Sequence, residues 1–335
     1  MAYDVKVKID LAMPVGNIGM GIPLILLENA ETAVAYTECS SIAAVEAAGF
    51  KAESDVHKAA KLIFRQEHAP KQVAVCAVTS DAADALADDK LVEKGWRQLI
   101  VVNSGSNASA VTELIPLMED LENKMLFVGL ETDDSTSITV TDISRTVLFY
   151  CDATADAPVP VAALVGETAG REPGSFTYKN LILKGILPQD LTDLEIEAIH
   201  NKGGITYVQK AGDNVTSEGK VAGGEYIDII DSKDYIVQQL RYKTQKLLNS
   251  AAKVPYDNNG IALLESVAVD VLQRAYNNGM IAVTADGKPD YFVEYALRED
   301  TDAADRAIRH YAGGKFGFAL AGAIHDVYIV GEITV

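Results

Sequence analysis

The chain has 335 residues, 48% of them hydrophobic, and a formal net charge of −19 at pH 7. This composition predicts a folded protein of about two domains and excludes an intrinsically disordered chain. The negative charge argues against nucleic-acid binding, which depends on Lys and Arg to neutralise phosphates. No apolar run reaches the roughly 20 residues of a membrane helix, and the start, MAYDVKVK, lacks the pattern of a signal peptide. We therefore expect neither nucleic acid nor membrane insertion among its interactions.

The first residues alternate apolar and polar side chains in the manner of a β-strand. A strand at a chain end must pair its backbone groups with its own sheet or with a neighbour's. We interpret residues 1–20 as a strand arm that ends in a glycine-rich turn. The arm residues expected to make contacts between subunits are Tyr3, Val5, Val7 and Ile9.

An α/β domain is predicted for residues 21–174, because near-continuous apolar strands alternate with amphipathic helices. That alternation is typical of a mostly parallel sheet with helices on both faces. The predicted strands are 23–27, 73–78, 98–102, 125–130 and 146–151, and the predicted helices are 52–67, 81–94, 106–121 and 159–170.

An α+β domain is predicted for residues 175–325, after the Pro173-Gly174 turn. Residues 326–335 form a second strand arm, because both faces of this segment carry β-forming side chains and it closes the sequence. Its predicted contact residues are Val327, Ile329, Ile333 and Val335. The predicted helices of the domain are 191–201, 232–250 and 258–278, and its first two strands are 205–209 and 214–221.

The sequence contains no complete catalytic motif. The loop after strand 98–102 holds Ser104 and Asn107, but it lacks both the P-loop and the dinucleotide-binding spacing. The five histidines include no metal-binding pair, and Cys39, Cys76 and Cys151 are isolated, which indicates buried thiols in a reducing cytoplasm. We predict no catalytic, cofactor-binding or metal-binding residues. The alternative kept open is an α/β enzyme that binds a nucleotide or phosphate through residues 104–107.

A short helix near residues 300–312 carries the most distinctive surface pattern. Arg306, Arg309, His310 and Lys315 could form a basic patch for an acidic partner on an otherwise acidic protein. The other interpretation is internal, because Asp302 and Asp305 stand four residues before the two arginines, a spacing that favours ion pairs within a helix. The sequence leaves both interpretations open.

Four segments carry a resemblance to a known family. They are GEYIDII at 224–230 with the long helix after it, KVPYDNNGIA at 253–262, ADRAIR at 304–309 and LAGAIH at 320–325. In this combination and order they resemble the contractile tail sheath proteins of phages, and the resemblance covers roughly residues 175–335.

The resemblance implies a structural subunit that stacks as hexameric rings around a tail tube. It implies that the terminal strands complete a small sheet in an adjacent subunit, and that contraction drives the tube through a target envelope. The helix with Arg306 and Arg309 is similar to the segment that touches the tube. The implied partners are the chain itself, the tube protein, and baseplate and tail terminator proteins. The particle would be a phage tail or a phage-derived bacteriocin, assembled in the bacterial cytoplasm. A baseplate component of the same particle is a further alternative.

Overall fold

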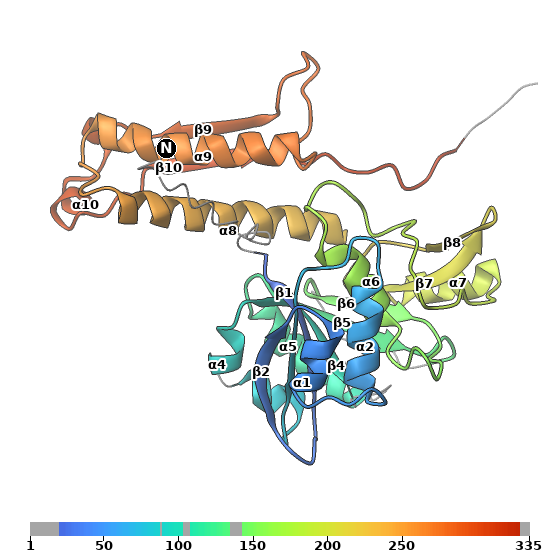
Figure 1. Ribbon diagram of the computed structural model, residues 1–335. Coiled ribbons are helices and arrows are strands. Elements are labelled where there is room, and N and C mark those ends of the chain that lie inside the picture. Colours follow the sequence, from blue (N-terminus) through green and yellow to red (C-terminus); the bar gives the residue numbers. More distant parts are fainter. Residues whose placement is uncertain (1–19, 88, 103–107, 135–142, 329–335) are drawn as a thin grey trace, which may run out of the picture.

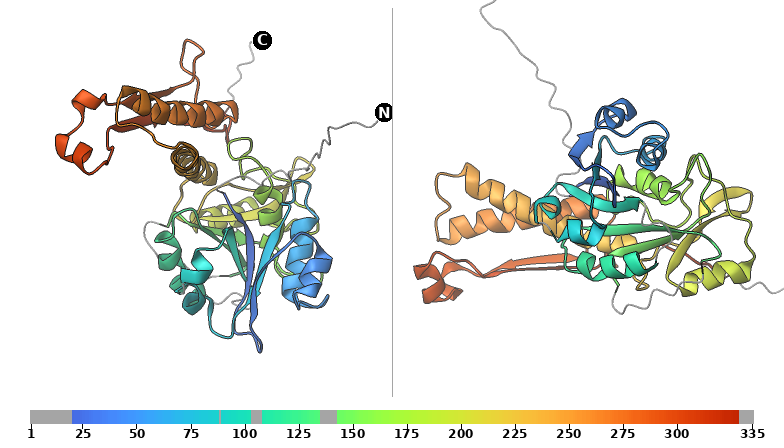
Figure 2. Two further views of the ribbon diagram at one scale, coloured as in Figure 1. Left: turned by 60° about the vertical axis from the view of Figure 1, so that its left-hand side comes forward. Right: turned by 90° about the horizontal axis from the view of Figure 1, so that it is seen from below.

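The computed structural model describes residues 20–87, 89–102, 108–134 and 143–328 (Figure 1). These residues form a body built around one sheet and a projection of two long antiparallel helices, which lies above the body in Figure 1 and extends past its outline in both views of Figure 2. We call the second part the helical projection. Among the described residues, no helix is long and apolar enough to cross a membrane.

An eight-stranded sheet runs through the body in the order β2-β3-β1-β4-β5-β6-β7-β8. The six strands other than β2 and β8 are parallel, while β2 is antiparallel to β3 and β8 is antiparallel to β7. The strands β3 and β6 are buried at every position, as expected where helices cover both faces of a parallel sheet. The strands are β1 (Ile22–Leu27), β2 (Val34–Cys39), β3 (Val73–Ala77), β4 (Trp96–Val102), β5 (Met125–Leu130), β6 (Thr146–Tyr150), β7 (Gly204–Lys210) and β8 (Asp213–Thr216).

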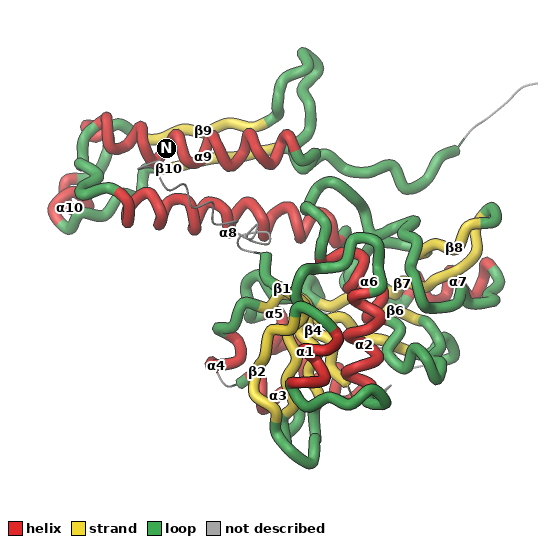
Figure 3. Tube along the Cα trace, viewed as in Figure 1, coloured by secondary structure: helices red, strands yellow, loops and turns green. Residues whose placement is uncertain are grey.

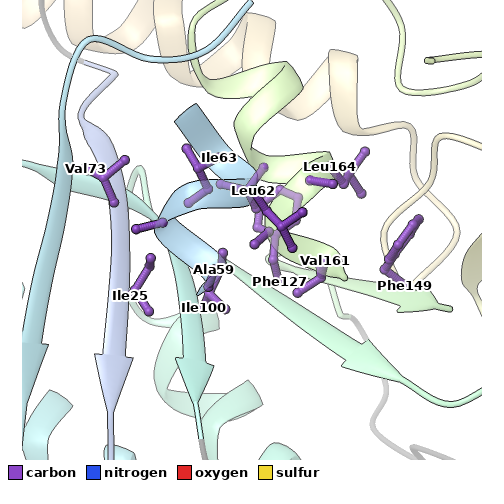
Figure 4. Packing of buried hydrophobic residues seen from close by; sticks show 14 of the residues in the cluster. Ile25, Ala59, Leu62, Ile63, Val73, Ile100, Phe127, Phe149, Val161 and Leu164 are labelled. Carbon is purple, nitrogen blue, oxygen red and sulfur yellow. The ribbon is translucent and has the colours of Figure 1, made fainter. Parts of the chain in front are cut away.

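Two helical layers cover the sheet (Figure 3). The first layer contributes to the larger core cluster, in which Ile63, Phe127, Val161 and their neighbours interdigitate (Figure 4). The second packs its apolar residues around Trp96 and Met118 on the other face. The first layer consists of α1 (Ile42–Ala47), α2 (Asp55–Phe64) and α6 (Val161–Ala169), and the second of α3 (Ala82–Leu86), α4 (Asp89–Val92), α5 (Ala108–Glu119) and α7 (Asp193–Asn201).

The contact between α2 and α6 depends on Gly166. A Cβ atom at this position would lie 2.6 Å from the Cα of Ile63 and 2.7 Å from its carbonyl oxygen. Such distances are far inside van der Waals contact, so only glycine allows the two helices to approach this closely. Gly166 therefore sets the thickness of the first helical layer.

The helical projection contains α8 (Ile227–Ser250), α9 (Asn258–Asn277), the 3₁₀ turn η1 (Arg298–Asp300), α10 (Ala303–Ala307) and a two-stranded antiparallel sheet of β9 (Tyr291–Tyr295) and β10 (Gly314–Phe318). A separate core cluster, centred on Ile236 and Leu272, joins α8, α9 and this small sheet. The start of α9 is capped by Asp257, whose side chain accepts from the backbone N–H of Gly260.

Most predicted elements are present, and the mixed α/β fold class with a mostly parallel sheet is confirmed. The structure adds β2 and α1, which were not predicted, and divides the expected helix 81–94 into α3 and α4. It also differs in one pairing: β7 and β8 were expected in the second domain but extend the first sheet through β6. The sheet thus continues past the predicted boundary at residues 174–175, because strand pairing joins segments that are distant in sequence.

Candidate functional surfaces

The carboxyl ends of the parallel strands are where an α/β sheet of this kind binds ligands, at the point where the strand order reverses. That point is β1, which has β3 on one side and β4 on the other. Glu28 follows β1 directly, is buried, and accepts a hydrogen bond of 2.9 Å from the backbone N–H of Ala82. Asp81 caps the same helix start by accepting from the N–H of Asp84. Two carboxylates of the chain therefore already bind the backbone N–H groups at the start of α3 that a phosphate would need as donors.

The same region holds a cavity of about 290 Å³ at the ends of β4 to β6. Its described lining includes Asp55 and Glu131 but neither lysine nor arginine, so its charge disfavours an anion. The described part of the chain contains no cluster of three or more His, Cys, Asp or Glu that could hold a metal ion. The predicted loop 104–107 lies outside the described residues. The described residues of this region therefore do not support the enzyme alternative.

A buried charge cluster joins α8 to the body, and no pattern in the sequence indicated it. Arg97 on β4 donates to Asp234 at 2.8 Å and also to Asp231, both of which lie on α8. Arg145 donates to Asp234 from the residue before β6, and the Tyr178 hydroxyl donates to Asp231 at 2.9 Å. The side chains of Arg97, Asp231 and Asp234 are each less than 10% exposed. The base of the helical projection is thus fixed by paired charges.

These contacts determine how the cluster ionises. Burial raises the pKa of Asp234, but the hydrogen bond from Arg145 and the charge of Arg97 together hold it below its ordinary value. Burial lowers the pKa of Arg97, and the charges of Asp231 and Asp234 more than reverse that effect. Arg97 and Asp234 are therefore both charged at neutral pH, so removing either one takes a partner from a charge that stays buried.

The two-stranded sheet of the projection has open edges. The backbone N–H of Ala296 donates to Gly313, and that of Ala319 donates to Asp290, which fixes the alternation of bonded pairs along both strands. Every second residue therefore turns its N–H and C=O outward. No backbone hydrogen bond among the described residues occupies these outward groups, which belong to Tyr291, Val293 and Tyr295 on β9 and to Gly314, Phe316 and Phe318 on β10.

The tip of the projection carries the predicted basic residues. Arg306 lies in α10, but its guanidinium turns inward and donates to the backbone carbonyls of Thr301 and, at 3.1 Å, of Arg298. Arg309 has a φ of +60°, so the helix ends before it and the predicted continuous face with Arg306 does not form. Asp302 caps the helix by accepting from the N–H of Ala304 instead of pairing with Arg306. Neither of the predicted ion pairs, Asp302–Arg306 or Asp305–Arg309, is found among the described residues.

The remaining basic residues of the tip, Arg309, His310 and Lys315, are exposed. A groove of about 1130 Å³ lies beside them, lined by residues that include Tyr256, Arg306 and Arg309. The hydroxyl of Tyr256 donates to the carbonyl of His310 at 3.0 Å, which ties the tip to the segment that precedes α9. Two of the segments that carry the family resemblance, 253–262 and 304–309, thus meet at this tip.

The described C-terminal segment, residues 321–328, returns toward the body (Figure 1). His325 is buried there, 2.9 Å from the hydroxyl of Thr177 and 3.2 Å from a carboxylate oxygen of Glu218. Its ring packs edge-on against Tyr226, with 4.8 Å between the ring centroids. The sequence did not single out these contacts, which join residues more than 100 positions apart.

The predicted strand arms are described only in part. Val327 and Tyr328 are exposed and belong to no strand, and Ile329, Ile333 and Val335 lie outside the described residues. The N-terminal arm residues, Tyr3, Val5, Val7 and Ile9, also lie outside them. Their pairing therefore stays a prediction.

Comparison with known proteins agrees with the architecture. Over residues 227–333 the sequence matches the family described as E217 tail sheath protein gp31-like, C-terminal domain. A search of curated proteins found no match.

Three solved structures share the fold over almost the whole chain. A chain of the anti-feeding prophage baseplate has a TM-score of 0.73 and 13% identity, covering 100% of this chain and 99% of that one. The contracted helical sheath of the anti-feeding prophage has a TM-score of 0.72 and 14% identity, covering 99% of this chain and 98% of that one. The contracted PVC sheath of an extracellular contractile injection system has a TM-score of 0.71 and 12% identity, covering 100% of this chain and 97% of that one.

The chain therefore has the fold shared by these sheath and baseplate chains of contractile injection systems. The predicted resemblance to contractile tail sheath proteins is confirmed, by fold over the whole chain and by family over its C-terminal third.

Proposed function

We propose that the chain is the structural subunit of a contractile tail sheath. It polymerises as stacked hexameric rings around a tail tube, and its contraction drives the tube through a target envelope. Its partners are further copies of itself, the tube protein, and the baseplate and tail terminator proteins. The particle is a phage tail or a phage-derived bacteriocin, assembled in the host cytoplasm. This role is structural and requires no catalytic residue.

The observation that carries this proposal is the pair of open edges on the β9–β10 sheet. Each edge presents three residues whose N–H and C=O groups point outward. Unpaired edges of this kind are templates for strand addition. The chain also carries alternating, β-forming segments near both ends, at 1–20 and 326–335. Two edges and two arms per subunit allow every subunit to receive arms from neighbours and to give its own.

The inner face of the small sheet supports strand addition. Tyr291, Val293 and Phe318 face the core of the projection but are only partly buried there, since two strands are too narrow to cover it. Added strands on either side would widen the sheet over α8 and α9 and bury more apolar surface. Isolated two-stranded sheets are at best marginally stable, and further strands stabilise them.

The basic residues at the tip fit contact with a tube of acidic surface charge. Arg309, His310 and Lys315 are exposed on a chain whose net charge is −19. Arg306 would act indirectly, because its hydrogen bonds to the Thr301 and Arg298 carbonyls hold the tip loop in shape. Attraction between exposed charges is weak per pair but repeats around each ring.

Electron microscopy of the purified chain, alone and with its tube protein, tests the proposal. Full-length protein should form rings or tubes. Deletion of residues 326–335 or of residues 1–9 should leave folded monomers. Replacement of Phe316 by proline removes an outward N–H without breaking a hydrogen bond between β9 and β10, so it should also block assembly. Phe316→Ala is its control, since it removes the same side chain but keeps the donor.

Polymerisation by either truncated chain would refute strand exchange. A chain that remains a small, discrete oligomer under all conditions would refute the sheath assignment itself. One further candidate function has an observation in its favour: the similarity to a chain of the anti-feeding prophage baseplate. A baseplate component would bind the end of the tube but would not extend along it, which the same micrographs distinguish.

A further inference from the structure

His325 is the single inserted residue in an otherwise exposed segment. Its side chain is 6% exposed, whereas Ile324 is 85% and Tyr328 92% exposed. Every other residue of 321–328 is also exposed. The imidazole of His325 is therefore the one side chain of this segment that is buried in the body.

The socket for this imidazole is polar on two sides and aromatic on a third. Thr177 and Glu218 lie at hydrogen-bonding distance from its two nitrogens, and Tyr226 supplies the ring contact. The adjoining Asp326 adds an ion pair of 3.2 Å with Lys179, whose ammonium also lies 3.9 Å from Glu218. The imidazole can make both hydrogen bonds whether it is neutral or protonated, since Thr177 can donate or accept.

A second attachment lies four residues earlier. The backbone N–H of Ala321 donates to the carbonyl of Met280 at 2.9 Å, and Leu320 bridges to Ile281. Between the two attachments, residues 322–324 make no hydrogen bond among those of the described residues, and the space beside the Cα of Gly322 is open. A crevice of about 360 Å³ lies under this short span.

We propose that His325 is a latch that sets the length of the C-terminal strand arm. With the latch closed, the free arm begins after His325. With the latch open, it begins after Ala321, which adds four residues and about 13 Å of reach. The latch is closed in the free subunit and opens when sheath contraction draws an inserted arm away from its own body. This inference rests on the proposed sheath function and adds a means by which the arm stays inserted while the bodies move.

The chemistry of the His325 side chain suits a reversible contact. An apolar side chain in the same position would lose its burial on opening, and its surface would meet water. The imidazole instead exchanges its hydrogen bonds for bonds to water, as do Thr177 and Glu218. Residues 322–324 of the freed span are exposed already, so outside the socket opening breaks chiefly the ion pair between Asp326 and Lys179.

Spin-label distances test the latch first in the free subunit. Labels at Glu225→Cys, beside the socket, and Tyr328→Cys, on the exposed segment, report whether the two are held together. The native cysteines are buried, so labelling is selective. The otherwise unmodified protein should give one narrow distance. His325→Ala should broaden it and extend it by up to about 13 Å, and Thr177→Val should broaden it partly. Ile324→Ala, at the exposed neighbour, should leave it unchanged.

The same label pair in assembled sheaths tests the opening. The narrow distance should persist in extended sheaths and lengthen in contracted ones. An unchanged distribution in the His325→Ala subunit would refute the latch, and equal distances in the two sheath states would refute its opening. Failure of the chain to polymerise would refute the proposed function, while the free-subunit measurement would still decide whether His325 is a latch.

Discussion

Replacement of Arg97 by methionine should strongly destabilise the joint between the body and α8. The substitution keeps much of the side-chain volume but removes the guanidinium that pairs with Asp231 and Asp234. Loss of one partner from a buried ion pair costs about 3–5 kcal/mol, because the remaining charge stays buried without compensation. In the Arg97→Met variant Asp234 keeps its hydrogen bond from Arg145, and Asp231 keeps its hydrogen bond from the Tyr178 hydroxyl. We therefore expect a loss near the lower end, about 3 kcal/mol.

The chain provides a matched control on the same helix. Arg241 of α8 pairs with Glu122 of the body, but both side chains are more than half exposed. Arg241→Met should cost no more than about 1 kcal/mol, the ordinary range for surface pairs. The two substitutions are chemically identical, and both affect contacts between α8 and the body. The difference between their losses of unfolding free energy therefore measures the effect of burial on the ion pair.

Urea unfolding followed by tryptophan fluorescence is the assay. The sequence has one tryptophan, Trp96, which is buried and directly precedes Arg97, so its emission reports on the joint. Asp231→Asn in the Arg97→Met background should recover part of the loss, because it removes an uncompensated charge. A loss from Arg97→Met no larger than that from Arg241→Met, or a double variant no more stable than the single one, would refute this account of the joint.

Acid provides an independent check on the same cluster. The pKa of Asp234 is lower in the folded protein than its ordinary value. Its contribution to stability is therefore complete above about pH 4, the value of an unperturbed aspartate, and is lost as pH falls through the folded pKa. The Arg97→Met variant should lose less stability over that acidic window, since Asp234 would then lack one of the two cations that depress its pKa.

Three further outcomes follow from positions described above. Gly166→Ala should lower the unfolding free energy by about 1–3 kcal/mol, because the added methyl group overpacks α2 against α6. Gly95→Ala is the control: its added methyl group meets only open space, so the unfolding free energy should change little in the same urea titration. Charge reversal at Arg309 and Lys315 together should leave the subunit folded but weaken its co-sedimentation with tubes, and unchanged binding would assign these residues to solubility. Glu28→Gln should weaken the acceptor at the start of α3 and lower thermal stability without creating phosphate binding, and phosphate binding by the variant in calorimetry would revive the enzyme alternative.

Local patterns in the sequence were sufficient for the centre of the sheet. The strands β3 and β6 are apolar at nearly every position, and Asp257 marks the start of α9 by a short-range cap. The edge strand β2 was not predicted, because Val34–Cys39 mixes polar and apolar residues, as a partly exposed edge requires. Helix α10 is shorter than predicted, since the backbone at Arg309 reverses in a way that the amphipathic pattern does not encode.

Long-range contacts account for what the sequence could not reveal. Arg97 meets Asp231 and Asp234 across more than 130 residues, and nothing in the neighbourhood of any of them signals that pairing. The socket of His325 has the same origin. A lone histidine in an apolar segment is uninformative until the fold places Thr177 and Glu218 around it.

The two sheets of this chain differ at their edges, and in the proposed assembly this difference would govern which strands can pair. At one end of the large sheet the register of β2 shifts between Val34 and Thr37, an irregularity that discourages further pairing. At its other end, the backbone of Thr216 in β8 exchanges hydrogen bonds with Asn180 and Leu181, which cover the edge. Only the small sheet presents regular, unoccupied edges among the described residues. If subunits exchange strands as proposed, an incoming strand from a mixture of identical subunits would have one kind of destination, and the shape of the monomer would limit errors of polymerisation before any ring exists.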